Sequence, residues 1–131
     1  MSGIIGLINV SAATVGASEV TSKWYENVSS TSRVTLITPT SGKKVRIISA
    51  EVLSTSSNLA ALEVYFGTGA NITTTAANAI YEATTDADHT PSSIGVWPDG
   101  GGPVGAVDEV VSIRANASVN SNRFIVHYRE E

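Results

Sequence analysis

The chain has no cysteine among its 131 residues, which excludes disulfide bonds, thiolate metal sites and cysteine nucleophiles. It is also poor in charge, because Asp, Glu, Lys and Arg make up only 15%, whereas about a quarter is usual in globular domains. The net charge is −4, and only Lys43, Lys44 and Arg46 bring basic residues close together. Because neutralising phosphates requires clustered Lys and Arg, we expect no nucleic-acid partner.

Long hydrophobic runs are missing as well. The most apolar stretch, residues 4–10 (IIGLINV), is interrupted by Gly6 and Asn9, and no Lys or Arg precedes it. This pattern does not fit a signal peptide, and it falls far short of the ~20 apolar residues that span a bilayer. We therefore expect a soluble protein without a targeting signal and without a membrane partner.

What is present is a share of 42% hydrophobic residues, arranged in short β-branched runs between clusters of Ser, Thr, Asn, Gly and Pro. The expected strands are residues 22–28, 33–38, 44–53, 61–66, 79–83, 94–97, 109–115 and 122–129. Residues 76–82 fit one helical turn as an alternative. The pattern predicts an all-β fold, an antiparallel β-sandwich of about eight strands that is jelly-roll-like. An immunoglobulin-like sandwich is the alternative, although the chain lacks the Cys and Trp markers of that fold.

The length fits a single domain, with residues 21–131 forming the sandwich. Residues 1–20, the N-terminal segment, are either an edge strand of that domain or an arm that lies on a neighbouring subunit. The candidate contact residues of this segment are its large apolar side chains, Ile4, Ile5, Leu7, Ile8 and Val10. They need cover from water, and our hypothesis is that a neighbouring subunit or a larger assembly provides it.

Two antiparallel hairpins are predicted, one between residues 44–53 and 61–66 and one between residues 109–115 and 122–129. In the return arm of the first hairpin, alternation indicates one buried face and leaves Glu63 and Tyr65 on the other face. Its first arm is apolar on both faces near the middle, which indicates either cover on both sides or a β-bulge. The expected core consists of Ile47, Leu62, Val64, Phe66, Val111, Ile113, Phe124 and Val126.

No group of residues predicts catalysis or cofactor binding. Asp86, Asp88 and His89 lie close together on an expected loop, but the calcium-loop pattern is missing, so we expect no metal site. His127 alternates with apolar residues on a strand, which favours a surface or interface position over a catalytic base. Adjacent carboxylates such as Asp108 and Glu109 point to opposite faces of a strand and cannot form a glycosidase pair alone.

One candidate function is that of a ligand-binding β-sandwich, such as a carbohydrate-binding or receptor-binding tip module. Aromatic side chains supply the stacking surfaces of sugar-binding modules, and the candidates are Trp24, Tyr25, Tyr65, Tyr81 and Trp97. Their even scatter along the chain favours core and edge positions instead.

Four stretches together resemble the small β-sandwich virion proteins of tailed bacteriophages, among them head-decoration proteins. They read SGKKVRIISAEVL (41–53), LEVYFG (62–67), VVSIRANASV (110–119) and RFIVHYREE (123–131). The resemblance covers residues 33–131. It implies a non-enzymatic protein that decorates or cements a capsid, commonly as a homotrimer, and that contacts the major capsid protein lattice, often through an N-terminal segment. It also implies a virion location, after assembly in the host cytoplasm.

Overall fold

The computed structural model describes residues 19–26, 32–54, 59–69, 78–85, 92–98, 101–116 and 122–131. This part of the chain contains eight strands. They are β1 (Thr21–Glu26), β2 (Val34–Ile37), β3 (Val45–Ser54), β4 (Ala60–Phe66), β5 (Ala79–Thr85), β6 (Ser92–Val96), β7 (Val111–Ala115) and β8 (Asn122–Glu130). All eight expected strands are therefore confirmed, with ends that differ by a few residues.

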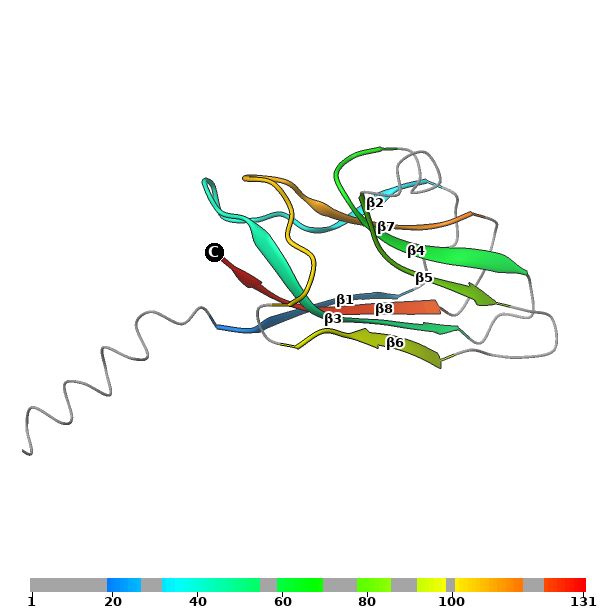
Figure 1. Cartoon of the computed structure of the whole chain (residues 1–131). Coiled ribbons are helices and arrows are strands. Elements are labelled where there is room, and N and C mark those ends of the chain that lie inside the picture. The colour runs from blue at the N-terminus through cyan, green and yellow to red at the C-terminus, as the bar shows by residue number, and fades with distance from the viewer. Residues whose placement is uncertain are drawn as a thin grey trace, which may run out of the picture.

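The strands form two four-stranded antiparallel sheets, in the orders β1-β8-β3-β6 and β2-β7-β4-β5, that pack face to face (Figure 1). The first strand pairs with the last, β2 with β7, β3 with β6, and β4 with β5. This is the pairing of one long hairpin that has been rolled so that its strands alternate between two sheets. The connectivity confirms the predicted antiparallel sandwich and gives it jelly-roll topology.

Both predicted hairpins are wrong, because β3 and β4 belong to different sheets, and so do β7 and β8. Each strand of these pairs contributes one face to the shared core, so the two strands pack across the sandwich instead of side by side. The connections at residues 55–59 and 116–121 are longer than the two-residue turns that force neighbouring strands into one ladder. A chain that crosses between sheets about 10 Å apart needs this extra length.

The apolar residues on both faces of β3 are explained by a β-bulge. The register between β3 and β8 shifts between Ile47 and Ser49, which inserts one extra residue. Val45 and Ile47 point into the core before the shift, and Ala50 and Val52 point into it afterwards. The bulge thus reverses the alternation of buried residues, as one of the two predicted explanations required.

The predicted core is confirmed, since all eight of its residues are at most 4% exposed. The prediction that β4 has only one buried face is wrong, because all seven of its residues are buried. Glu63 and Tyr65, on the face away from the core, are 1% and 0% exposed. Hydrogen bonds make this burial possible: Arg114 donates to Glu63, and the Tyr65 hydroxyl donates to the Gly69 carbonyl at 2.8 Å.

A loop completes the sheet beside the first half of β3. The bulge ends the pairing with β6 near Ile48, and residues 102–105 then take the place of β6. Ile47 N–H donates to Pro103 O at 2.9 Å, and Gly105 N–H donates to Val45 O at 3.0 Å. Gly102 is required here, because a Cβ at this position would collide with the Ile47 carbonyl oxygen.

Candidate functional site

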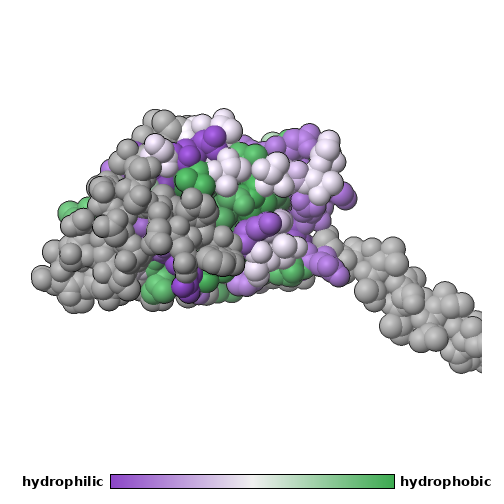
Figure 2. All heavy atoms as spheres, turned by 180° about the vertical axis from the view of Figure 1, so that it is seen from behind, coloured by the Kyte–Doolittle hydropathy of each residue, from purple (hydrophilic) through white to green (hydrophobic). Residues whose placement is uncertain are grey.

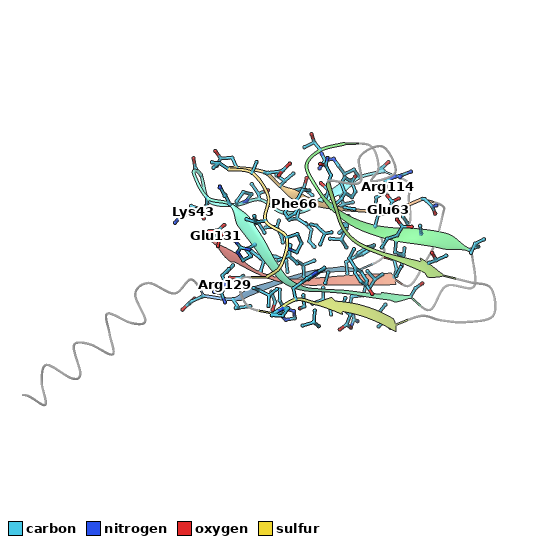
Figure 3. The ribbon with its side chains drawn as sticks, viewed as in Figure 1. Lys43, Glu63, Phe66, Arg114, Arg129 and Glu131 are labelled. Atoms are coloured by element: carbon cyan, nitrogen blue, oxygen red, sulfur yellow. The ribbon has the colours of Figure 1, made fainter. Side chains whose placement is uncertain are left out.

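One end of the sandwich gathers several segments that are distant in sequence. Here the chain enters β1, β8 reaches the C-terminus, and β3 begins (Figure 1). The turn at 41–42 and the loop at 101–108 lie beside the start of β3. We call this region the terminal end of the sandwich. Figure 3 shows Lys43, Arg129 and Glu131 there.

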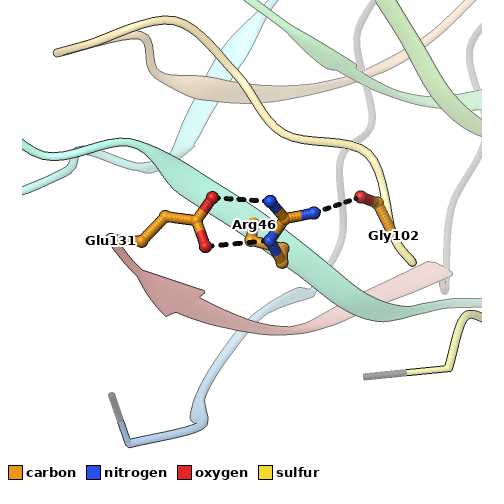
Figure 4. A network of polar contacts seen from close by, with 3 residues as sticks. All are labelled: Arg46, Gly102 and Glu131. Atoms are coloured by element: carbon orange, nitrogen blue, oxygen red, sulfur yellow. Dashed lines mark hydrogen bonds and ion pairs between the residues drawn. The ribbon is translucent and has the colours of Figure 1, made fainter. Parts of the chain in front are cut away.

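Arg46 joins three segments of the terminal end (Figure 4). Its guanidinium grips the Glu131 carboxylate with two hydrogen bonds, Nη2–Oε1 at 2.7 Å and Nε–Oε2 at 2.9 Å. Its Nη1 donates to the Gly102 carbonyl at 3.0 Å. A bidentate contact of this kind fixes the orientation of the two side chains as well as their distance. Arg46 therefore holds Glu131 and the loop at 101–108 against β3.

Two more carboxylates fasten the turn that precedes β3. Glu130 accepts hydrogen bonds from the backbone N–H and the hydroxyl of Thr40, at 2.7 and 2.8 Å. Asp108 accepts from Gly42 N–H at 2.6 Å and has a positive φ of 62°, a conformation that Asp tolerates better than most residues. The terminal end is therefore a defined surface and not a set of independent loops.

The hydrogen bonds to the two C-terminal glutamates make the terminal end sensitive to acid. The Thr40 backbone N–H lowers the pKa of Glu130 below its ordinary 4.5, and the Arg46 side chain does the same for the pKa of Glu131. A carboxyl with a lower pKa in the folded state stabilises the fold above its unfolded pKa, and this contribution is lost as the pH falls through the folded value. We expect the E130Q/E131Q variant to melt at a lower temperature than the wild type near neutral pH, with a difference that shrinks below pH 4.5.

The measurement is a series of thermal melts from about pH 7 to about pH 3. Glu51→Gln is the matched control, because Glu51 is half-buried on β3 and lies opposite Ile94 and Ile125 in the ladder, away from these contacts. A constant difference between E130Q/E131Q and the wild type across the series would contradict the assignment.

The terminal end also exposes three valines. Val20, Val104 and Val107 are 50%, 41% and 52% exposed. Val104 lies opposite Arg46, which in turn lies opposite Arg129 in the first sheet. In the coloured part of the face that lies away from the view of Figure 1, hydrophobic residues reach the surface between hydrophilic ones (Figure 2). Exposed apolar side chains that lie close together are candidates for contacts with another molecule.

A second polar cluster lies on the outer face of the sheet β2-β7-β4-β5. Arg114 on β7 and Glu63 on β4 are directly opposite one another and form an ion pair with Nη1–Oε2 at 3.2 Å (Figure 3). Next to it, the Arg33 guanidinium donates to Ser112 Oγ at 3.1 Å, and Ser112 Oγ donates to the Gly67 carbonyl at 2.6 Å. These groups satisfy one another's hydrogen bonds, which indicates a structural role.

Sequence reasoning missed this ion pair because each residue alone fits the solvent face of an alternating strand. The available signal was weak: two opposite charges in a chain poor in charge, each flanked by apolar residues. It becomes specific only when β4 and β7, about 50 residues apart in sequence, are known to be neighbours.

His127 hydrogen bonds through Nδ1 to Ser49 Oγ at 2.9 Å. The two residues are directly opposite one another on β8 and β3, so the contact is an ordinary cross-strand pair. His127 is half-buried on the outer face of its sheet.

The aromatic candidates for ligand stacking do not form one platform. Tyr65 is buried, and Tyr81 and Trp97 pack against the core. Tyr81 and Trp97 flank Gly95, where an added Cβ would lie 2.7 Å from the Tyr81 ring and 3.3 Å from the Trp97 ring. Tyr65, Tyr81 and Trp97 therefore occupy the core and edge positions that their scatter predicted, while the side chains of Trp24 and Tyr25 lie outside the described part.

Several predicted residues cannot be placed. Asp86, Asp88 and His89 lie outside the described residues, and so do the contact candidates Ile4, Ile5, Leu7, Ile8 and Val10. Within the described ranges, no three His, Asp or Glu side chains lie together as metal ligands would. The same ranges contain no helix with the length and hydrophobicity to cross a membrane.

Comparison with known proteins gave no match: no protein-family model, no curated protein and no solved structure is similar to this chain.

Proposed function

We propose that this protein is a non-enzymatic structural protein of a bacteriophage virion, which decorates or stabilises a capsid through contacts with its own copies and with the capsid lattice. The terminal end carries the proposal. It presents exposed valines beside a network of fixed charges, at the place where the N-terminal segment joins the sandwich.

The topology supports the same class. Eight-stranded jelly rolls are common in viral capsid proteins, and they also occur in lectins and cupins. Fold alone does not assign a function. The composition adds support, because a chain with 15% charged residues and many small polar ones suits flat, closely packed contacts between subunits.

The N-terminal segment supplies the apolar side of the proposed contact. Burying a large aliphatic side chain contributes about 1.5–3 kcal/mol, so a few of these residues suffice to hold an assembled state. In the proposal, Ile4, Ile5, Leu7, Ile8 and Val10 contact a neighbouring copy or the capsid lattice. A homotrimer is the assembly that the resemblance implies.

Deletion of residues 1–20 tests the proposal. We expect the truncated chain to remain folded, because the deletion ends just before β1, and to show weakened self-association or weakened binding to the capsids of the encoding phage. The measurements are thermal melting, light scattering and co-sedimentation with capsids.

Two full-length variants separate contact from folding. Replacing Ile4, Ile5, Leu7 and Ile8 with serine should have the same effect as the deletion. Leu59→Ser is the matched control, since Leu59 is 69% exposed but follows β3 at the opposite end of the sandwich. A monomeric wild type whose truncation unfolds it would make residues 4–10 an ordinary core strand and would move support to the ligand-binding alternative.

A further inference from the structure

Each sheet exposes two outer strands, and β6 is the one without protection against pairing with another chain. Natural proteins blunt such edges with charges, bulges, proline or very short strands. Among the described outer strands, β1 contains Lys23 and Glu26, and β5 contains Glu82 and a register shift. β2 has only four residues and a register shift as well.

In contrast, β6 reads Ser-Ser-Ile-Gly-Val, without a charge or a proline. It pairs with β3 through five consecutive residues without a register shift, and its other side pairs with no strand in the described part. Val96, its last residue, is 66% exposed. A regular, uncharged edge of this kind is a template for strand addition.

The backbone shows which residues face the free edge. Trp97 N–H donates to Ile48 O at 3.0 Å, so Trp97 directs its backbone groups toward β3. Backbone groups alternate along a strand, so Ser92, Ile94 and Val96 direct their N–H and C=O groups away from β3.

We infer that β6 pairs antiparallel with β6 of a second copy around a two-fold axis, giving one continuous eight-stranded sheet. An axis at Ile94 sets Ile94 opposite itself and Ser92 opposite Val96 of the partner copy. All three outward residues then fall in hydrogen-bonded pairs, each of which exchanges two N–H···O bonds. An axis at Gly95 would set Ser92 opposite Pro98, which has no N–H to donate.

The partner is a second copy because the edge is complementary to itself. It carries no charge that would repel its own copy. In the register centred on Ile94, the outward N–H and C=O groups of all three residues form hydrogen bonds with the second copy. A two-fold contact of this type is isologous, so every interaction occurs twice. The inference does not depend on the proposed capsid role, and it predicts dimers or assemblies with an even number of copies instead of an isolated trimer.

Charge pairs placed on the edge of the full-length chain test the register. In S92K/V96K two pairs of lysines meet across the axis, and in S92E/V96E two pairs of glutamates meet. We expect each variant to raise the dimer Kd by about tenfold or more, because like charges directly opposite one another destabilise a ladder. A 1:1 mixture of the two variants should associate as a heterodimer. S92K/V96E, which carries the same number of added charges in attractive positions, should self-associate.

Sedimentation velocity gives the masses, and thermal melting checks that each variant is folded. Hydrogen exchange should slow at Ser92, Ile94 and Val96 as the wild-type concentration rises. A trimer or monomer that S92K/V96K leaves unchanged would overturn the inference, and so would a mixture of the two like-charged variants that stays monomeric. Deletion of residues 1–18 provides a further test. If it abolishes the slowing of hydrogen exchange in β6, the inference is overturned as well, because the apolar N-terminal segment then occupies the edge.

Discussion

Phe124→Ala is expected to destabilise the protein by about 3–5 kcal/mol, a third or more of the stability of a typical domain. Phe124 is 0% exposed on β8, a central strand of the first sheet. It lies between Tyr25 of β1 and Val52 of β3 in the ladder, so the removed ring leaves a cavity that the paired backbones cannot close.

Urea denaturation and thermal melting measure the loss, and the melting temperature should fall by about 10–20 °C. Ile125→Ala is the matched control, because Ile125 is the next residue of the same strand but is half-buried on the outer face. Its loss should be about 1 kcal/mol. Equal effects of the two substitutions would contradict the burial of Phe124 between the sheets.

The position of Phe124 illustrates what the sequence could predict. Alternation in residues 122–129 placed Phe124 and Val126 on one face, and strand geometry makes that assignment local. The same local logic pointed to the bulge in β3, because Val45 and Ile47 differ in parity from Ala50 and Val52. Core membership and strand positions therefore followed from patterns that span about ten residues or fewer.

Strand pairing did not follow, because it depends on contacts between distant parts of the chain. A two-residue loop between two alternating strands is a strong indication of a hairpin. The indication becomes weaker as the loop becomes longer. Here the strands joined by residues 55–59 cross to opposite sheets, and the partners of β3 are β6 and β8, about 40 and 75 residues away.

The candidate sites also differ in whether a local sequence pattern could predict them. The C-terminal network of Arg46 and Glu131 joins residues 85 positions apart, so no local pattern predicts it. The apolar character of residues 4–10 is visible in the sequence, and it remains the basis of the assembly hypothesis. The edge of β6 became recognisable only when the topology showed which four strands are outermost.

The buried ion pair provides the other large expected effect. Arg114→Ala should destabilise the protein by about 3–5 kcal/mol, because it removes the charge that faces the buried Glu63 carboxylate. Glu63 is 1% exposed, and its other neighbour in the ladder is Glu82, a second negative charge. The Arg114 side chain is 14% exposed, so it reaches water more easily than Glu63 does.

This asymmetry distinguishes the two partners. Glu63→Gln should cost less than Arg114→Ala, since the guanidinium left behind can be partly hydrated. Replacing both residues with apolar ones, in E63L/R114M, should restore much of the stability, because the cost arises mainly from a buried charge that has lost its ion-pair partner. The double-mutant cycle formed by E63L, R114M and E63L/R114M, measured by urea denaturation, gives the coupling directly.

Acid provides an independent check of the Arg114→Ala variant. The Glu63 carboxylate of this variant can take up a proton as the pH falls, so the deficit in stability relative to the wild type should shrink toward low pH. Lys23→Ala is the matched control, because Lys23 is exposed on β1 opposite Val126 and its loss should change stability by only about 0.5 kcal/mol. If Arg114→Ala behaves like Lys23→Ala, Glu63 is hydrated in solution and the outer face of β4 is open to water.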